Sequence, residues 1–191
     1  ESFIRRMFTH LLNGLREVHA KKLLHLDIKP ANIYITMEGK PVLLDFGAAR
    51  QALTSDAPRL RPMYTAGYAA PEQYHSLEQL GPWSDIYAVG ATIYTCLTGV
   101  HPQPANERGK EDQMIPAKEL ARQNYSAELY EIVDWCLKLD HLGRPQTAFE
   151  LQKALMREIK EMPGEVEAVE EAVADDSLAG RLRKTLNRKI F

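Results

Sequence analysis

Two short polar segments, one on each side of a single hairpin, constrain this chain more than any other feature. They are Asp27-x-Lys29-x-x-Asn32 and Asp45-Phe46-Gly47. The β-branched and aromatic residues 33–36, a turn at 38–39 and the apolar residues 42–44 predict a short β-hairpin between them. Because a hairpin brings its two ends together, we expect the two polar segments to lie side by side.

The side chains of these two segments are the groups that phosphoryl transfer requires. Asn32 and Asp45 offer amide and carboxylate oxygens, which suit a hard cation such as Mg²⁺. Asp27 is a candidate acceptor for a hydroxyl proton, and Lys29 can neutralise a phosphoryl group. Either aspartate alone would more often form a turn or a cap, so only the joint pattern favours catalysis.

Five segments of the chain resemble motifs of the protein kinase family in order and spacing. They resemble the catalytic loop, the DFG motif, the APE motif, the start of the central helix and a later arginine segment, at residues 25–32, 45–47, 70–72, 84–90 and 139–145. Residues 65–73 look most like those of bacterial-type Ser/Thr kinases. The resemblance implies a mainly α fold with a small β-hairpin: the carboxy-terminal lobe of a kinase over residues 1–160, with an activation segment over 45–72 and the amino-terminal β lobe absent.

The resemblance also implies roles for single residues. Asp27 would orient the substrate hydroxyl and accept its proton, while Lys29 would contact and neutralise the transferring phosphoryl group of ATP. Asn32 and Asp45 would hold Mg²⁺, and Tyr34 would form the floor under the adenine. The implied reaction is transfer of the ATP γ-phosphoryl group to a protein hydroxyl.

Further residues would position this machinery. Thr65 falls where Ser/Thr kinases place a threonine that bonds the catalytic aspartate and lysine, which implies Ser/Thr rather than Tyr substrates. Asp85 would hold the backbone of the catalytic loop, and Glu72 would form a structural ion pair with Arg144. His25 would pack near the DFG phenylalanine rather than transfer a proton.

The chain departs from the family pattern in two ways. The glycine-rich loop, strand lysine and helix glutamate that complete the nucleotide site would precede residue 1, and no GxGxxG occurs. We therefore expect a fragment of a longer protein, inactive alone.

Leu26 is the second departure, because it stands where many members have an arginine that binds an activation-segment phosphate. Activation should then depend little on phosphate, unless Arg50, Arg59 or Arg61 substitutes.

The rest of residues 1–160 is predicted to be helical between loops. Apolar spacing predicts helices over 1–20, 82–98 and 126–138. Thr147 and Glu150 predict the start of a last core helix carrying Phe149, Leu155, Met156 and Ile159. The stretches 48–70 and 100–116 lack periodicity and predict long loops.

Composition excludes several classes of protein. Lys and Arg total 24 and Asp and Glu 26, so charge gives no support for a nucleic-acid partner. The longest uncharged apolar run, 86–100, is shorter than the roughly 20 residues that a membrane span needs. Cys96 and Cys136 lie far apart without a Cys/His cluster, which argues against a disulfide scaffold or zinc site. We expect buried thiols and a cytoplasmic location, although the complete protein could be membrane-attached.

Residues 161–191 are predicted to be a separate charged tail. Residues 161–176 carry seven acids and no bases, and residues 177–191 carry five bases and no acids. Four apolar residues spaced by four predict a basic amphipathic helix: Leu178, Leu182, Leu186 and Ile190. Such a helix could contact an acidic membrane surface or partner, or pack on its own lobe.

Three readings of function and partners stay open. The favoured one is a Ser/Thr protein kinase lobe that works with a protein substrate and the missing amino-terminal lobe. The others are a kinase-like small-molecule phosphotransferase and a non-catalytic pseudokinase or scaffold. A free large lobe would also expose apolar surface, so self-association is a further expectation.

Overall fold

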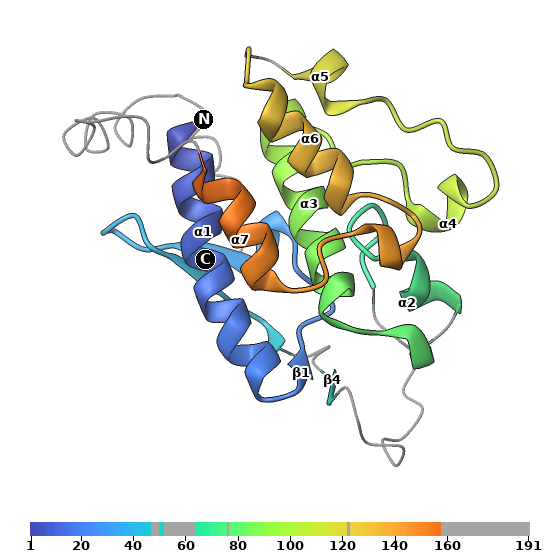
Figure 1. Ribbon diagram of the computed structural model, residues 1–191, viewed down its shortest axis with the longest axis horizontal. Helices are drawn as coiled ribbons and strands as arrows, with labels where there is room; N and C mark the ends of the chain where they lie inside the picture. The colour runs from blue at the N-terminus through green and yellow to red at the C-terminus, as the bar shows by residue number, and fades with distance from the viewer. Residues whose placement is uncertain (47–49, 52–63, 76, 122, 158–191) are drawn as a thin grey trace.

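The computed structural model describes residues 1–46, 50–51, 64–75, 77–121 and 123–157, and most of these lie in helices (Figure 1). The helices are α1 (Ser2–Ala20), α2 (Pro71–His75), α3 (Pro82–Thr98), α4 (Ala105–Arg108), α5 (Ala117–Leu120), α6 (Ala127–Cys136) and α7 (Ala148–Met156). Short 3₁₀ turns occupy Pro30–Asn32, Leu77–Gln79 and His141–Gly143. The predicted mainly α fold is confirmed, while the predicted loop over 100–116 was wrong in part because it contains α4.

Within the described residues, two small antiparallel sheets accompany the helices. Strand β2 (Ile33–Ile35) pairs with β3 (Pro41–Leu43), which confirms the predicted hairpin. Strand β1 (Leu23–Leu24) pairs with β4 (Arg50–Gln51), a sheet that the sequence did not predict because its strands are short and far apart. In β2 the side chains of Ile33 and Ile35 are buried, while Tyr34 pairs with Val42 on the opposite face.

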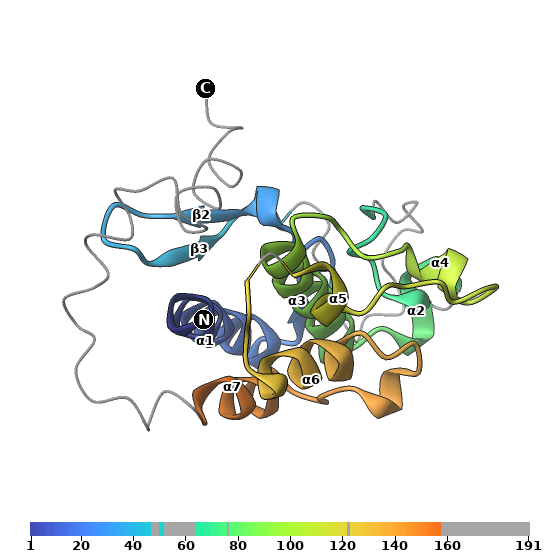
Figure 2. The ribbon, with the colours of Figure 1, turned by 90° about the horizontal axis from the view of Figure 1, so that it is seen from above.

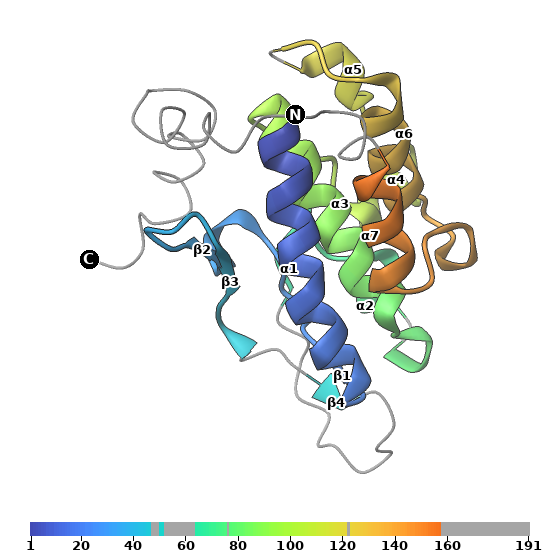
Figure 3. The ribbon, with the colours of Figure 1, turned by 60° about the vertical axis from the view of Figure 1, so that its left-hand side comes forward.

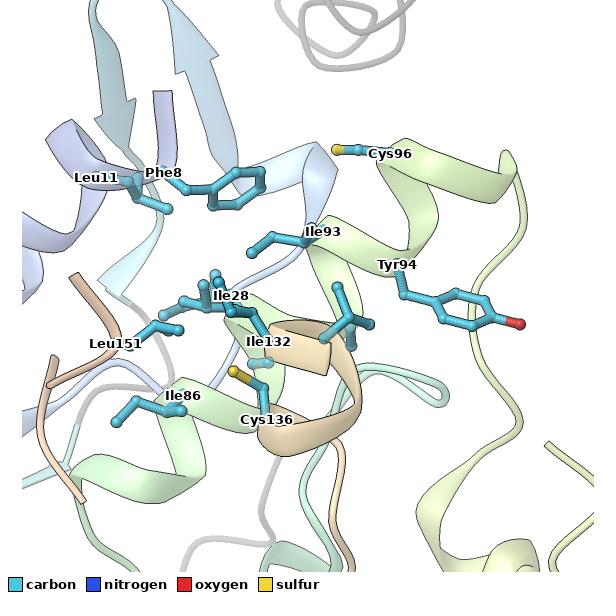
Figure 4. Packing of buried hydrophobic residues seen from close by; sticks show 14 of the residues in the cluster. Phe8, Leu11, Ile28, Ile86, Ile93, Tyr94, Cys96, Ile132, Cys136 and Leu151 are labelled. Carbon is cyan, nitrogen blue, oxygen red and sulfur yellow. The ribbon is translucent and has the colours of Figure 1, made fainter. Parts of the chain in front are cut away.

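Helix α3 is the centre of the fold and is buried along most of its length. Helix α6 packs against it, and α1 packs against α7 (Figures 1 and 3). Seen from above, α1 lies between the β2–β3 hairpin and α7 (Figure 2). Figure 4 shows side chains of α1, α3, α6 and α7 meeting in one apolar core, among them Phe8, Ile93, Ile132 and Leu151. This core supports the hairpin and the loops at its ends.

Helix α3 begins and ends at residues that the sequence marks. Pro82 occupies the first turn, where its missing N–H costs no hydrogen bond. Gly99 follows the helix with φ 83°, a left-handed conformation that glycine adopts without steric cost, and its N–H donates to the carbonyl of Thr95. The N-terminus of α7 is also as predicted, because the Thr147 hydroxyl accepts from the N–H of Glu150.

The predicted core face of α7 was wrong in two residues. Phe149 and Met156 are exposed, whereas Leu151 and Leu155 are buried. The helix turns Leu151 and Leu155 toward the core, which leaves Phe149 outside that face. The Phe149 ring instead lies under two cations, with the Arg16 guanidinium 4.8 Å and the Lys153 ammonium 4.9 Å from its centroid. Ile159, also predicted to be in this core, lies outside the described residues.

Both cysteines are buried and free, as expected. Among the described residues, no helix combines the length and apolar character needed to cross a bilayer. Most of the predicted 48–70 loop and the charged tail 161–191, with its amphipathic helix, lie outside the described residues.

Candidate active site

Three side chains from two distant segments form a closed triangle of hydrogen bonds. The Lys29 ammonium donates to the Asp27 carboxylate (Nζ to Oδ2, 2.7 Å) and to the Thr65 hydroxyl (Nζ to Oγ1, 2.7 Å). The Thr65 hydroxyl in turn donates to the other Asp27 oxygen, with Oγ1 2.8 Å from Oδ1. Residues 27 and 65 are 38 positions apart in the chain. The structure therefore brings together all three residues that the sequence singled out as catalytic.

A tight turn places Thr65 against this pair. The N–H groups of Tyr68 and Ala69 both donate to the Thr65 carbonyl. Gly67 has φ 85° within the turn, and a Cβ there would lie 2.8 Å from Nδ1 of His101. Glycine suits this position for two reasons: it adopts a positive φ without strain, and it has no Cβ to meet His101. His101, to which the sequence gave no role, thus supports the segment that carries Thr65.

Asn32 extends the network toward the second polar segment. Its Nδ2 donates to the Asp27 carbonyl (2.8 Å) and to the Asp27 carboxylate (2.9 Å). Since Nδ2 points at Asp27, the amide oxygen Oδ1 lies on the opposite side of the group. The backbone carbonyl of Asn32 accepts from the N–H of Leu44 at 2.8 Å. Asp45 directly follows Leu44, so the backbone of Asp45 lies next to that of Asn32. The hairpin register thus brings the two predicted oxygen donors into neighbouring positions.

The backbone of the catalytic loop is strained and is held by a buried carboxylate. Leu26 has φ 63°, a conformation that costs a non-glycine residue about 1–3 kcal/mol and persists only where the surrounding structure imposes it. Asp85, fully buried in the first turn of α3, accepts from the N–H groups of His25 (2.9 Å) and Leu26 (2.7 Å). His19 also bonds this carboxylate (Nε2 to Oδ2, 2.8 Å). Asp85 therefore has the expected contact with the loop backbone, and His19 is a partner that the sequence did not indicate.

His25 makes packing and hydrogen-bonding contacts that suit a structural role. Its Nε2 lies 3.0 Å from the Leu44 carbonyl, and its Nδ1 accepts from the N–H of Asp27 at 3.3 Å. An N–H can only donate and a carbonyl can only accept, so these partners fit a neutral ring with the proton on Nε2. The ring also packs edge-on against Phe46, with centroids 4.7 Å apart. His25 therefore connects the two polar segments.

The segment after Thr65 is anchored by two neighbouring residues of α2. Glu72 is buried and forms a bidentate pair with Arg144, as the sequence predicted. Gln73, which the sequence analysis missed, donates from Nε2 to the Leu26 carbonyl at 2.9 Å. A glutamine three residues after the start of a helix, as Gln73 is after Ala70, is a sequence signal for a helix cap. No local signal indicates its distant partner Leu26.

Tyr34 lies on the outer face of the hairpin, next to the polar network. It is partly buried, and in β2 it follows Ile33, the residue after Asn32. Val42 pairs with it across the hairpin. The structure thus puts Tyr34 in the same strand as Ile33, two residues after Asn32, and its role as an adenine floor stays a prediction.

Comparisons with known proteins agree with this geometry. The family model described as protein kinase domain matches residues 1–157. The chain is 33% identical over 151 residues to mitogen-activated protein kinase kinase 3 of Arabidopsis thaliana, covering 76% of this chain and 29% of that protein. It is 32% identical over 170 residues to serine/threonine-protein kinase PknA of Nostoc sp., covering 85% of this chain and 29% of that protein.

A solved structure shares the fold as well as the sequence. The structure titled "PpkA-294 apo form" has a TM-score of 0.69 and 37% sequence identity, with 81% of this chain and 54% of that chain covered. This chain therefore spans under a third of the length of the two curated relatives and about half of that solved chain. The matched motifs, their geometry and the extent of the match show that the chain belongs to the protein kinase family.

Proposed function

We propose that this chain is the carboxy-terminal lobe of a Ser/Thr protein kinase. In the complete enzyme it transfers the γ-phosphoryl group of ATP to protein Ser or Thr hydroxyls. The observation that carries this proposal is the closed hydrogen-bond network in which Asp27 is held by Lys29, Asn32 and Thr65. Both relatives named above are protein kinases, and the name of one of them, serine/threonine-protein kinase PknA, supports the same class of acceptor.

We propose a separate task for each member of the network. Asp27 orients the substrate hydroxyl and accepts its proton, and three donors fix its carboxylate in one rotamer. Lys29 provides positive charge beside that carboxylate, where negative charge gathers on the transferring group. Thr65 ties the activation segment to both residues, so Asp27 is correctly placed only when that segment is in place.

The residues next to Asp27 fit a magnesium–nucleotide. Asn32 and Asp45 provide hard oxygen donors, which Mg²⁺ prefers to nitrogen or sulfur. In the described part of the chain, no group of three or more His, Cys, Asp or Glu side chains could hold a metal by itself. Two such donors are enough for Mg²⁺, which binds one or two protein oxygens together with substrate phosphates and water. Bound Mg-ATP would supply the phosphoryl group with its charge partly neutralised.

The apolar outer face of the hairpin is where we place the adenine and the amino-terminal lobe. Val42, the cross-strand partner of Tyr34, is 43% exposed, and Phe46 at the hairpin end is 46% exposed. Exposed apolar groups are typical of a surface that another domain covers. Because the chain has no glycine-rich phosphate loop, we propose that it is inactive alone and becomes active only with that second lobe.

The experiment compares the complete gene product with the 191-residue chain in a phosphotransfer assay with Mg-ATP and a generic protein acceptor. We expect phosphate on Ser and Thr with the complete product and none with the 191-residue chain. Asp27→Asn should abolish transfer, because an amide cannot accept the hydroxyl proton. Asp140→Asn is the matched control and should keep full activity, because Asp140 caps the distant turn at Leu142 and asparagine caps equally well.

Each other outcome contradicts a stated part of the proposal. Transfer to small amino or sugar alcohols but not to proteins would identify a small-molecule phosphotransferase. ATP binding without any transfer would identify a non-catalytic scaffold. Turnover by the 191-residue chain alone, abolished by Asp27→Asn, would overturn its inactivity while supporting the assigned chemistry.

A further inference from the structure

Gln73 has a buried side-chain amide that makes two hydrogen bonds with two different segments. Only 3% of the residue is exposed. Its Oε1 accepts from the N–H of Ala70 at 2.9 Å, and its Nε2 donates to the carbonyl of Leu26 at 2.9 Å. An N–H can only donate and a carbonyl can only accept, so the orientation of the amide is unambiguous. Gln73 therefore caps the start of α2 with one end and reaches the catalytic loop with the other.

The carbonyl that Gln73 bonds belongs to the strained residue Leu26 of the catalytic loop. Leu26 has φ 63°, and both of its backbone polar groups are held by side chains from other elements. Asp85 of α3 accepts from its N–H, and Gln73 of α2 donates to its carbonyl. The next residue along the chain is Asp27. The peptide plane between Leu26 and Asp27 is thus set in part by the Gln73 amide.

We propose that Gln73 is a positioning residue for phosphoryl transfer, which couples the end of the activation segment to Asp27 through a neutral hydrogen bond. This inference rests on the proposed kinase function. If α2 moves away, the Leu26 carbonyl loses its partner inside the protein, and the backbone of Leu26 loses one of the two side chains that hold it. Asp27 then no longer keeps the position that Thr65 and Lys29 require. The coupling uses no charge, so it operates without a phosphate group.

Two substitutions isolate this bond from the other tasks of the side chain. Gln73→Glu keeps the size of the residue and an oxygen for the Ala70 N–H, but an ionised carboxylate cannot donate to the Leu26 carbonyl. Gln73→Met fills similar space with neither a charge nor a donor. Loss of the bond to Leu26 is what both variants share, so an effect common to both is assigned to that bond. Gln79→Glu, at an exposed glutamine nearby, controls for added negative charge.

The kinetic test uses the complete gene product. We expect kcat to fall about 10- to 100-fold in both Gln73 variants, with the KM for Mg-ATP unchanged, because a misplaced base slows the chemical step rather than nucleotide binding. Gln79→Glu should retain the wild-type kcat. Wild-type kcat in a folded Gln73→Glu or Gln73→Met variant would overturn the inference, as would a change confined to KM. If the unmodified enzyme transfers no phosphate to protein, it is the proposed function that fails.

A second test needs no activity and uses the 191-residue chain itself. We expect the amides of His25 and Leu26 to exchange with solvent deuterium faster in both Gln73 variants, since they bond Asp85 only while the loop keeps its conformation. Amides of α6, which has no contact with this loop in the hydrogen-bond network, should exchange at the wild-type rate. Unchanged protection of His25 and Leu26, or an equal loss in α6, would overturn the coupling whatever the kinase assay shows.

Discussion

Arg144 and Glu72 are 72 residues apart in the chain and form a buried bidentate ion pair, with Nη1–Oε1 at 2.8 Å and Nη2–Oε2 at 3.1 Å. The guanidinium also donates to the carbonyls of Lys138 and Leu139, and the Ser84 hydroxyl donates to Glu72. Both charges are therefore fully hydrogen-bonded, which is the condition under which a buried pair is tolerated. The pair fixes α2 against the segment before α7.

Removing the cation should strongly destabilise the lobe. Arg144→Met leaves the Glu72 carboxylate buried without its partner, so we expect the free energy of unfolding to fall by about 3–5 kcal/mol. Urea denaturation of the 191-residue chain, followed by circular dichroism, measures this. Lys40→Met is the control, because Lys40 and Glu38 are 3.8 Å apart on an exposed turn, where an ion pair contributes little. Equal stability of the Arg144→Met variant and the wild type would contradict the assignment.

Two glycines in helices should respond to alanine with opposite signs. In α3, a Cβ on Gly90 would lie 2.3 Å from Cβ of Cys136 on α6, so α3 and α6 must separate to admit it. We expect Gly90→Ala to cost about 1–3 kcal/mol of stability. In α1, a Cβ on Gly14 meets nothing within 4 Å, so Gly14→Ala should stabilise by about 0.5–1 kcal/mol through helix propensity.

Thermal or urea unfolding of the two alanine variants tests this contrast directly. Cys136→Ala should not rescue Gly90→Ala, because the close contact is with Cβ, which alanine retains. A neutral or stabilising effect of Gly90→Ala would show that the two helices do not approach as closely as described.

The two thiols should report unfolding and alkaline loss of stability. Burial raises the pKa of Cys96 to about 12 and also raises the pKa of Cys136. Both thiols should therefore resist alkylation in the native state and react once urea unfolds the chain. Thiols in the unfolded chain ionise near pH 9.0, below their pKa in the folded protein. Rising pH therefore favours the unfolded state, so the free energy of unfolding is unaffected by the thiols below pH 9.0 and falls as the pH rises toward 12. Mass spectrometry after iodoacetamide treatment counts the labelled thiols; native labelling of either would contradict their burial.

Activity of the complete enzyme should depend little on phosphate in the activation segment. Leu26 is apolar and 6% exposed, so the residue before Asp27 cannot bind a phosphate group. We expect phosphatase-treated enzyme to keep most of its kcat, with removal of phosphate verified by mass spectrometry. The structure does not describe the side chains of Arg50, Arg59 and Arg61. Loss of most kcat after phosphatase treatment would indicate that one of these arginines binds a phosphate group.

Local chemistry was sufficient to predict several elements. Pro82 begins α3 because the first turn does not need the backbone N–H that proline lacks. Gly99 ends α3 because glycine adopts a left-handed φ without steric cost. The hairpin and its polar ends followed from β-branched, aromatic and apolar residues on both sides of a turn, so the neighbouring positions of Asn32 and Asp45 were predictable. Phe149 was misplaced because hydrophobicity does not reveal which face of a short helix meets the core.

By itself the amino-acid sequence determined which residue types stand at the motifs, where the main helices begin and how the hairpin pairs, because these depend on contacts within a few residues. The resemblance to kinases also anticipated that Thr65 meets Asp27. Only the tertiary structure decided that Gln73 reaches Leu26 and that His19 joins Asp85, over 47 and 66 positions respectively. Such partners depend on how whole helices pack against one another, and no local periodicity encodes that packing.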